Sequence, residues 1–387
     1  MLKPRLISRL SKTDWDFAGK FSESPFSAIH WYPGRFVSQL PATFIGLLAP
    51  PGGTVVDPFV GSGTTLVEAQ RLGRRSIGVD LNPIACLVSR AKTLRLPAQR
   101  IVSALTSIKH DAVDVIHGQM RTQHTLPSGT PIPSTVQATK WYSPRVLEHL
   151  ASLWSLVTSY RQHHRILAVA AFSAILLPVC RETRHWGYVC DNTEPDGGNR
   201  ADVLKEFLGV LDRLAQAYID RDQEIVARSE TFVMPPKSTI VCSNAVDAVS
   251  ALPSDSIDLV ITSPPYFGVS DYTKAQRLSM EWFGIDIEAL RLKEIGARSK
   301  RHRTTAAEDY VSELKSVFLV LHGRLRRGAP FVMIVGESAT RGSVLESLLS
   351  AAQTSGFRLQ LNVNRTVSSQ RNQTPSIHGE HLLVFTR

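Results

Sequence analysis

Apolar residues along the chain follow two patterns, and the two patterns occupy different stretches. Short β-branched or continuously apolar runs, typical of buried strands, lie near both ends of the chain. Between them, residues 140–228 repeat apolar positions at helical spacing, as at Leu147, Leu150 and Val157. The strand-like runs are residues 54–56, 75–79, 239–241, 257–261 and 330–335. The pattern predicts an α/β protein whose sheet is divided in sequence by a mainly helical insertion.

The remaining stretches give weaker signals. Residues 357–363 and 381–385 predict a terminal antiparallel pair of strands. Residues 1–26 are polar and predict an irregular arm. Residues 93–135 are mixed, and their Pro-, Thr- and Ser-rich part at 123–134 predicts an exposed loop or linker. A helix is expected to begin after Ser143, since serine caps helices and proline follows in the first turn.

A turn follows the apolar run at 257–261, and it carries more chemistry than any other segment. Its two prolines end the strand, because proline has no amide hydrogen to donate to a sheet. The turn therefore lies at the carboxyl end of a strand, where open α/β sheets bind ligands. Its hydroxyl, fixed carbonyls and aromatic ring suit a flat base with an exocyclic amino group. The residues are Thr262, Ser263, Pro264, Pro265 and Tyr266.

A glycine-rich turn follows the first predicted strand. Gly61 and Gly63 allow its backbone to approach a ligand closely. The second strand ends at Asp80, and an acid at that point is placed to bind ribose hydroxyls. Leu66 occupies the position of the third glycine in a dinucleotide fingerprint, which argues against NAD and against a pyrophosphate ligand.

Composition is that of a basic globular protein. The 387 residues are 43% hydrophobic and carry a formal net charge of +10, which favours a polyanionic partner such as DNA. The most apolar stretch, residues 166–179, is too short to span a membrane and predicts a buried helix. The first residues lack the apolar core of a signal peptide, so we expect a cytoplasmic protein.

The cysteines are widely separated in the sequence. None forms a C-x-x-C pair, so we expect reduced, buried thiols and neither disulfides nor a metal site. The four are Cys86, Cys180, Cys190 and Cys242.

Taken together, these residues resemble the DNA amino-methyltransferases, which use S-adenosylmethionine to methylate cytosine N4 or adenine N6. Residues 57–65, Asp-Pro-Phe-Val-Gly-Ser-Gly-Thr-Thr, are similar to the cofactor loop of that family, and residues 263–266 are similar to its catalytic loop. Residues 30–41 resemble the amino-terminal segment that closes over the methionine end of the cofactor. Residues 379–385 resemble the last strand of the family's sheet.

The resemblance covers most of residues 27–90 and 238–387, and it implies a Rossmann-like, seven-stranded methyltransferase sheet. Residues 1–92 and 236–387 are then the S-adenosylmethionine-dependent catalytic domain. Residues 93–235 are the helical insertion and the candidate target-recognition domain, because the chain after the catalytic loop is needed to finish the sheet.

The resemblance also implies roles for the catalytic loop. Ser263 and the carbonyl of Pro264 would accept hydrogen bonds from the exocyclic amine, and Tyr266 would stack on the base beside Pro265. The base must leave the duplex, because pairing and stacking otherwise bury the amine. Asp271 is a candidate acceptor for the released proton, although its position favours a solvated loop acid.

The implied cofactor contacts extend from the amino-terminal segment to the third strand. The glycine-rich loop would line the methionine and ribose side, and Asp80 would accept both ribose hydroxyls. Asn82 would lie beside the adenine. Asn244 is either an acceptor for the adenine amine, through its amide oxygen, or a simple turn residue. The full set is His30, Tyr32, Pro33, Asp57, Pro58, Phe59, Gly61, Ser62, Gly63, Thr64, Asp80, Leu81, Asn82 and Asn244.

Two basic stretches are candidates for contact with double-stranded DNA, with solvated surface as the alternative. One is at 291–303, after the catalytic loop, and the other is at 181–186 in the insertion. The arm at 1–26 is also expected near the DNA. A restriction endonuclease counterpart is compatible with this class, and the oligomeric state is open. The basic residues singled out are Arg181, Arg184, Arg298, Lys300, Arg301 and Arg303.

Serine before the two prolines is commoner in enzymes that methylate cytosine N4, whereas Asp or Asn is commoner for adenine N6. The sequence therefore predicts site-specific methylation of cytosine N4 in DNA. Adenine N6 methylation, an RNA methyltransferase and an inactive nucleic-acid-binding relative are the alternatives. No RNA-binding module is recognisable, and the cofactor and catalytic strings are both intact.

Overall fold

The computed structural model describes residues 1–17, 24–35, 37–119, 132–133, 138–182, 194–195, 197–198, 201–300, 302–338, 344–366 and 377–387. Arg184, Cys190 and Arg301 lie outside these ranges, as does nearly all of the loop expected at 123–134.

A seven-stranded sheet forms the centre of the catalytic part, with strand order β3-β2-β1-β4-β5-β7-β6. The first five strands in sequence are parallel, and β7 runs antiparallel to both β5 and β6. The predicted Rossmann-like sheet and its terminal antiparallel pair are therefore confirmed. The strands are β1 (Thr54–Asp57), β2 (Arg75–Asp80), β3 (Ser238–Cys242), β4 (Leu259–Thr262), β5 (Pro330–Ser338), β6 (Arg358–Thr366) and β7 (Ile377–Thr386).

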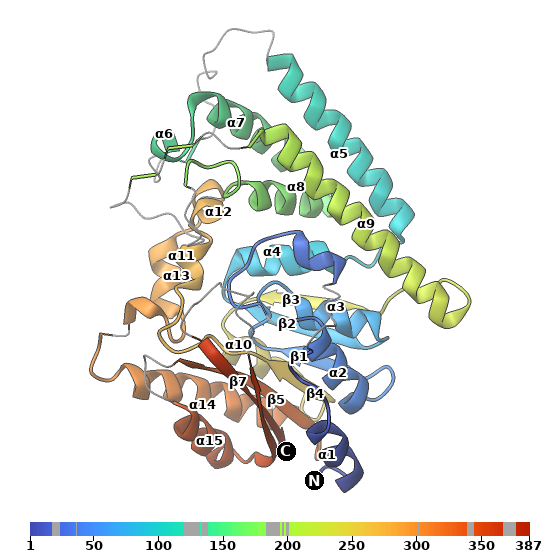
Figure 1. The fold of residues 1–387 in the computed structure, drawn as a ribbon, viewed down its shortest axis with the longest axis vertical. Coiled ribbons are helices and arrows are strands. Elements are labelled where there is room, and N and C mark those ends of the chain that lie inside the picture. Colours follow the sequence, from blue (N-terminus) through green and yellow to red (C-terminus); the bar gives the residue numbers. More distant parts are fainter. Residues whose placement is uncertain are drawn as a thin grey trace.

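Helices cover both faces of the sheet (Figure 1), and alternate residues of its central strands point to different cores. Val260 and Phe331 pack against α10 (Ala245–Ser250), α14 (Ala306–Arg324) and α15 (Leu345–Thr354). Leu259 and Ile261 pack on the other face, with α2 (Gln39–Leu48) and α3 (Thr64–Arg71). Because both faces are covered, all four residues of β4 are buried and its sequence is continuously apolar.

Three expectations about the local structure need correction. Residues 4–11 form helix α1 (Pro4–Ser11), not an irregular arm, because Leu10 is buried against the sheet and Leu2 donates a backbone hydrogen bond to Gln360 on β6. The mixed stretch after residue 93 contains the long helix α5 (Ala98–Gln119). The strand expected from 257 begins at Leu259, and Ile257 makes only an isolated bridge to Leu325.

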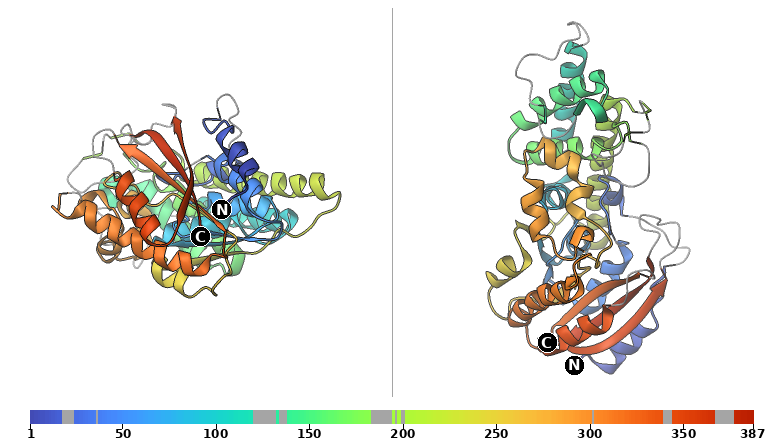
Figure 2. Two further views of the ribbon diagram at one scale, coloured as in Figure 1. Left: turned by 90° about the horizontal axis from the view of Figure 1, so that it is seen from below. Right: turned by 90° about the vertical axis from the view of Figure 1, so that its left-hand side faces the viewer.

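The insertion is helical, as predicted, and forms a lobe at one end of the molecule, opposite the two termini (Figure 2). Ser143 caps α7 as expected, since its hydroxyl accepts a hydrogen bond from the Val146 amide. No helix in the described ranges has the length and apolar character that a membrane span requires. The lobe contains α5, α6 (Ala138–Trp141), α7 (Pro144–Ser159), α8 (Gln162–Ile175) and α9 (Val203–Ser229).

The lobe does not have a core of its own, as a separate body would. Leu278 and Trp282 of α12 (Arg277–Trp282) are buried within the same apolar cluster as the lobe helices. Trp154 of α7 stacks on Phe283, with ring centroids 5.2 Å apart. Helices α11 (Tyr272–Ala275), α12 and α13 (Ile287–Lys293), which follow the catalytic turn, therefore connect the lobe to the sheet.

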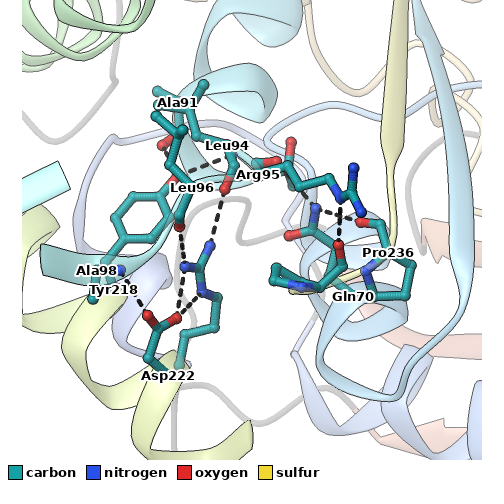
Figure 3. A network of polar contacts seen from close by, with 12 residues as sticks. Gln70, Ala91, Leu94, Arg95, Leu96, Ala98, Tyr218, Asp222 and Pro236 are labelled. Atoms are coloured by element: carbon teal, nitrogen blue, oxygen red, sulfur yellow. Dashed lines mark hydrogen bonds and ion pairs between the residues drawn. The ribbon is translucent and has the colours of Figure 1, made fainter. Parts of the chain in front are cut away.

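Buried polar contacts join the lobe to the sheet where the chain first crosses between them (Figure 3). The Tyr218 hydroxyl donates to the Ala91 carbonyl (2.8 Å) and accepts from the Leu94 amide (3.0 Å). Arg221, stacked on the Tyr218 ring, donates to the carbonyls of Leu94 (2.9 Å) and Leu96 (2.6 Å). These side chains of α9 therefore hold the segment between α4 (Pro83–Lys92) and α5.

The second crossing, between α9 and β3, is tied to the first. Asp222 accepts a hydrogen bond from the Ala98 amide (2.6 Å), which starts α5. The Gln70 amide on α3 donates to the carbonyls of Thr93 (3.0 Å) and Pro236 (3.1 Å), one on each crossing. Both connections are thus satisfied by side chains, and the lobe has a fixed orientation on the sheet.

Arg221 is the residue on which this junction depends most. Its guanidinium is also paired with Asp222 (2.6 Å). We expect Arg221→Met to lower the free energy of unfolding by about 3–5 kcal/mol, because Asp222 loses this cation and two backbone carbonyls lose their donor. Arg228→Met, about two turns further along α9 and half exposed, should cost less than about 1 kcal/mol. Denaturant titrations compare the two variants, and equal losses would contradict a specific role for Arg221.

Candidate active site

The glycine-rich loop and the catalytic turn are joined by one buried carboxylate. Asp57 ends β1 and is 1% exposed. Its Oδ2 accepts from the Thr65 hydroxyl at the start of α3 (2.7 Å), and its Oδ1 accepts from the Thr262 hydroxyl at the end of β4 (2.7 Å). The Phe59 amide also donates to Oδ1 (3.1 Å). Burial raises the pKa of Asp57 to about 6, and these three hydrogen bonds oppose that rise.

The loop reaches the second strand through its backbone. The Gly61 amide donates to Asp80 Oδ2 (2.8 Å), and the Gly61 carbonyl accepts from the Ser89 hydroxyl (2.9 Å). Gly63 caps α3 in the left-handed region (φ +84°), and a Cβ there would lie 2.7 Å from the Ser89 oxygen. Only glycine therefore allows α4 to approach the loop this closely.

Asp80 and Asn82 lie side by side at the carboxyl end of β2. Asp80 Oδ1 accepts from the Asn82 amide (2.8 Å), and Asn82 Oδ1 caps α4 by accepting from the Ile84 amide (2.9 Å). Burial raises the pKa of Asp80 to about 6, against the effect of its backbone donors. The Asn82 Nδ2 group is buried without a hydrogen-bond partner, so it is available to a ligand acceptor.

These groups face one cavity at the carboxyl ends of the parallel strands. It holds about 970 Å³ of space when the open solvent at its mouth is included. It brings together most of the residues singled out from the sequence: Tyr32, Pro33, Pro58, Phe59, Gly61, Ser62, Thr64, Asp80, Leu81, Asn82, Asn244, Ser263 and Pro265. The other lining residues include Arg35, Tyr272, Thr273, Leu290, Lys293 and Glu294.

Contacts with β5, β7 and α14 hold the turn at residues 262–266 in place. Tyr266 is 8% exposed, and its hydroxyl donates to Glu380 Oε1 on β7 (2.9 Å). Its ring lies so close to Gly336 on β5 that a Cβ there would be 2.4 Å from the ring. The Tyr310 hydroxyl of α14 donates to the Pro265 carbonyl (2.9 Å). Burial raises the pKa of the Tyr266 phenol, and a hydrogen bond with the Ser263 side chain opposes that rise.

Five of the predicted site residues are not among those that line the cavity. Asp57 and Gly63 hold the loop in shape, as described above, so their side-chain positions face the protein interior. His30 Nε2 is hydrogen-bonded to Ser173 Oγ on α8 (2.8 Å), and burial lowers its pKa to about 4. Pro264 and Tyr266 lie on the protected side of the turn, of which Ser263 and Pro265 form the cavity side.

Of the two remaining candidates, one stays a prediction and the other needs correction. The Asn244 amide oxygen caps α10 by accepting from the Asp247 amide (2.9 Å), and Asn244 also lines the cavity, so its role at the adenine stays a prediction. Asp271 is not a solvated acid, because it is buried and accepts from the Ser299 amide (2.9 Å). It is also absent from the cavity lining, which leaves it badly placed to take a proton from a substrate there.

Glu294 is an acidic residue of the cavity that the sequence did not indicate. It follows α13, within the basic stretch at 291–303, and no motif marks it. Its Oε1 accepts from the Tyr272 amide (2.6 Å), and burial raises its pKa to about 7. Only the contact between α11 and the end of α13 brings this carboxylate to the cavity, so a reading of local sequence could not find it.

The basic candidates differ in what the structure says of them. The ammonium of Lys300 is used within the protein, because it donates hydrogen bonds to the carbonyls of Leu292 (3.1 Å) and Glu294 (2.6 Å). Arg303 is exposed. Arg181 follows α8, and its backbone amide donates to the Trp141 carbonyl (2.8 Å). The structure describes the backbone of Arg298 but not its side chain.

The described cysteines are free thiols. Cys86 and Cys180 are buried as expected, but Cys242 is exposed at the end of β3. Within the described ranges, no three His, Cys, Asp or Glu side chains are grouped so that they could hold a metal ion.

Comparisons with known proteins find similar DNA methyltransferases. A model of a family described as DNA methylase matches residues 10–90. The chain is 22% identical to the type II methyltransferase M.MjaII of Methanocaldococcus jannaschii, over 84% of this chain and 76% of that protein. It is 26% identical to the type II methyltransferase M.MvaI of Kocuria varians, over 67% of this chain and 58% of that protein. The chain thus spans little more than half of the second relative.

Solved structures are more distant. The rRNA methyltransferase aviRa of Streptomyces viridochromogenes is 11% identical, with a TM-score of 0.37, over 95% of this chain and 93% of that one. A TehB-like methyltransferase of Corynebacterium glutamicum is 10% identical, with a TM-score of 0.32, over 90% of this chain and 86% of that one. Likenesses at this level carry no information about the substrate.

The sheet has a Rossmann-like, seven-stranded topology, and its cavity lies at the carboxyl ends of the parallel strands. The family match and the two relatives show that the chain is similar to S-adenosylmethionine-dependent DNA amino-methyltransferases. The lining residues fit the cofactor: Asp80 offers acceptors for hydroxyls, the free Nδ2 of Asn82 is a donor, and Glu294 offers a carboxylate to a cation. S-adenosylmethionine is therefore the cofactor.

Asp80→Asn tests this placement without removing the side chain. We expect S-adenosylmethionine to bind about tenfold to a hundredfold more weakly, because a charged acceptor of hydrogen bonds becomes neutral. Calorimetry on the purified variant gives the affinity. Asp212→Asn, on the surface of α9, is the matched control and should bind as the native protein does. Native affinity in Asp80→Asn would place the ribose elsewhere.

Proposed function

We propose that the protein is a site-specific DNA methyltransferase that transfers a methyl group to N4 of a cytosine flipped out of the duplex. The observation that supports this most is that Ser263 lines the same cavity as Asp80. A base seated on the turn would thus share a space with the cofactor. Reacting groups held close together, with a short in-line path, account for much of the rate of such a transfer.

We assign the following roles in cofactor binding and methyl transfer to residues of the chain. Asp80 and Asn82 hold the adenosyl part, and the glycine-rich loop closes beside it. When bound, S-adenosylmethionine supplies a methyl group on a positively charged sulfur. Ser263 accepts a hydrogen bond from the exocyclic amine and orients its nitrogen. Pro265, held by Tyr310, keeps the turn rigid.

Tyr266 supports the turn from its protected side. Its hydroxyl bond to Glu380 and its packing on Gly336 restrict the ring to one position. Because the ring is buried outside the cavity lining, its proposed role is to hold the turn that carries Ser263, and not to stack on the base as the sequence predicted. Cytosine is favoured over adenine because serine, not an acid or amide, precedes the two prolines.

The helical lobe at 93–235 is the proposed target-recognition element, and double-stranded DNA is the proposed partner. The lobe is fixed to the sheet by Arg221 and Tyr218, and it packs on α12, close to the turn in sequence. A rigid lobe next to the catalytic cavity can hold DNA in register with it. The net charge of +10 supports a polyanionic partner, and a restriction endonuclease counterpart belongs to the same proposal.

Ser263→Ala tests the catalytic assignment. We expect turnover on DNA to fall about tenfold to a hundredfold, since one hydrogen bond to the reacting amine is lost. Affinity for S-adenosylmethionine should stay within about twofold. Single-turnover transfer of labelled methyl and calorimetry measure the two quantities. Full turnover in this variant, or N6-methyladenine as the only product of the native protein, would reject the assignment to cytosine through Ser263.

Arg181→Ala tests the role of the lobe. An arginine that reads a base edge contributes about 1–3 kcal/mol at one position, so its loss should relax the methylated sequence there. A phosphate contact would instead weaken methylation of all sites alike. Sequencing of methylated positions in genomic DNA separates the two outcomes. If Arg181→Ala leaves the motif unchanged while Arg303→Ala alters it, recognition lies after the catalytic turn and not in the lobe.

A further inference from the structure

Glu294 is buried at the cavity wall with half of its carboxylate unused. The residue is 6% exposed, and Oε1 accepts from the Tyr272 amide at 2.6 Å. Oε2 is buried and has no hydrogen-bond partner. A buried carboxylate oxygen without a partner is costly to the folded protein, so its retention at a ligand cavity indicates a ligand that satisfies it.

The donors nearest to the Glu294 carboxylate are neutral, because they are the Tyr272 amide, which binds Oε1, and the amide and hydroxyl of Thr273. Tyr272 contributes its amide, and Tyr32, Asp80 and Asp271 face the same region as neutral or acidic groups. Lys300 donates to the backbone carbonyl of Glu294 and not to its carboxylate.

Two cations line the cavity, but neither is an ion-pair partner for Glu294 in the structure. Lys293 is exposed, so water screens its charge. Arg35 donates to the Ser27 carbonyl in the amino-terminal segment.

We propose that Glu294 recognises the positive charge of S-adenosylmethionine and so favours the methyl donor over the product left after transfer. This inference rests on the proposed methyl transfer, in which the donor carries one more positive charge than the product. In the proposed transfer the exocyclic nitrogen forms a bond to the methyl carbon, the carbon–sulfur bond breaks with its electron pair left on sulfur, and the amine loses one proton to solvent. S-adenosylhomocysteine, the product, is a neutral thioether at that position.

The energetics support this direction. Two unit charges interact strongly at short range where water is excluded, and far more weakly once one of them is neutral. Burial raises the pKa of Glu294 to about 7, because ionisation is unfavourable without a partner. A cationic ligand removes that penalty, and a neutral one does not. The cavity would therefore release the product more readily than the donor.

Glu294→Gln is the direct test, because glutamine keeps the shape of the side chain and an acceptor for the Tyr272 amide. Calorimetry with S-adenosylmethionine and S-adenosylhomocysteine gives two affinities for each protein. The native protein should prefer the donor by about tenfold or more. In Glu294→Gln we expect the donor to lose about tenfold more affinity than the product does. Glu288→Gln, on the exposed face of α13, is the matched control and should match the native protein.

A stability measurement distinguishes this role from a structural one. Because its folded pKa is raised from 4.5 to about 7, Glu294 costs the free protein stability increasingly as pH rises between these two values, and the full cost is present only above about 7. Glu294→Gln should therefore raise the Tm of the ligand-free protein at pH 8 and change it little at about pH 4, where the carboxyl is protonated in both states. A purely structural carboxylate would give a lower Tm in the variant.

The binding measurements separate a failure of the proposed function from a failure of the role of Glu294. If the native protein binds neither compound, the proposed function fails, whatever Glu294 does. If the native protein binds both equally, or if the variant loses the same affinity for both, Glu294 does not read the sulfonium charge and the inference is wrong. The native comparison holds even if the variant does not fold.

Discussion

The buried carboxylate of Asp57 is the constraint on which the site depends. Asp57 is the last residue of β1, and β1 lies next to β4 at the point where the strand order reverses. Its carboxylate accepts hydrogen bonds from the hydroxyls of Thr65 and Thr262. The cofactor loop and the catalytic turn are therefore fixed to the same group. This explains why two motifs about two hundred residues apart in the sequence meet at one cavity. An acid in this position serves the site by holding both of its halves, without facing the ligand.

A second set of contacts decides how the rest of the molecule is placed around that cavity. Tyr218 and Arg221 hold the helical lobe at the two chain crossings, and Trp282 of α12 enters the lobe core. The segment after the catalytic turn is thus shared between the lobe and the cavity wall. It carries Tyr272 and leads to Glu294, so the cavity wall and the lobe both depend on one short stretch of chain.

Much of this could be predicted from the sequence, because the signals were local. Continuous apolar runs predicted the strands, and the glycine loop and the acid at Asp80 predicted the ligand edge. What could not be predicted was set by long-range packing. The α1 helix is stabilised by a sheet edge more than three hundred residues away, and α5 lies in a stretch without a clear pattern. Asp57 and His30 were expected at the ligand, and only the folded structure shows that their partners are Thr65 and Ser173.

In the proposed reaction, one cavity holds the cofactor and the target base together. A crystal structure of the protein with S-adenosylhomocysteine and a duplex that contains its methylated site would show both. We expect the adenosyl group between Asp80 and Asn82, with an extruded cytosine whose N4 atom is within hydrogen-bond distance of Ser263. A cofactor bound outside this cavity, or a base held in it away from the Ser263 turn, would show that the two do not meet there.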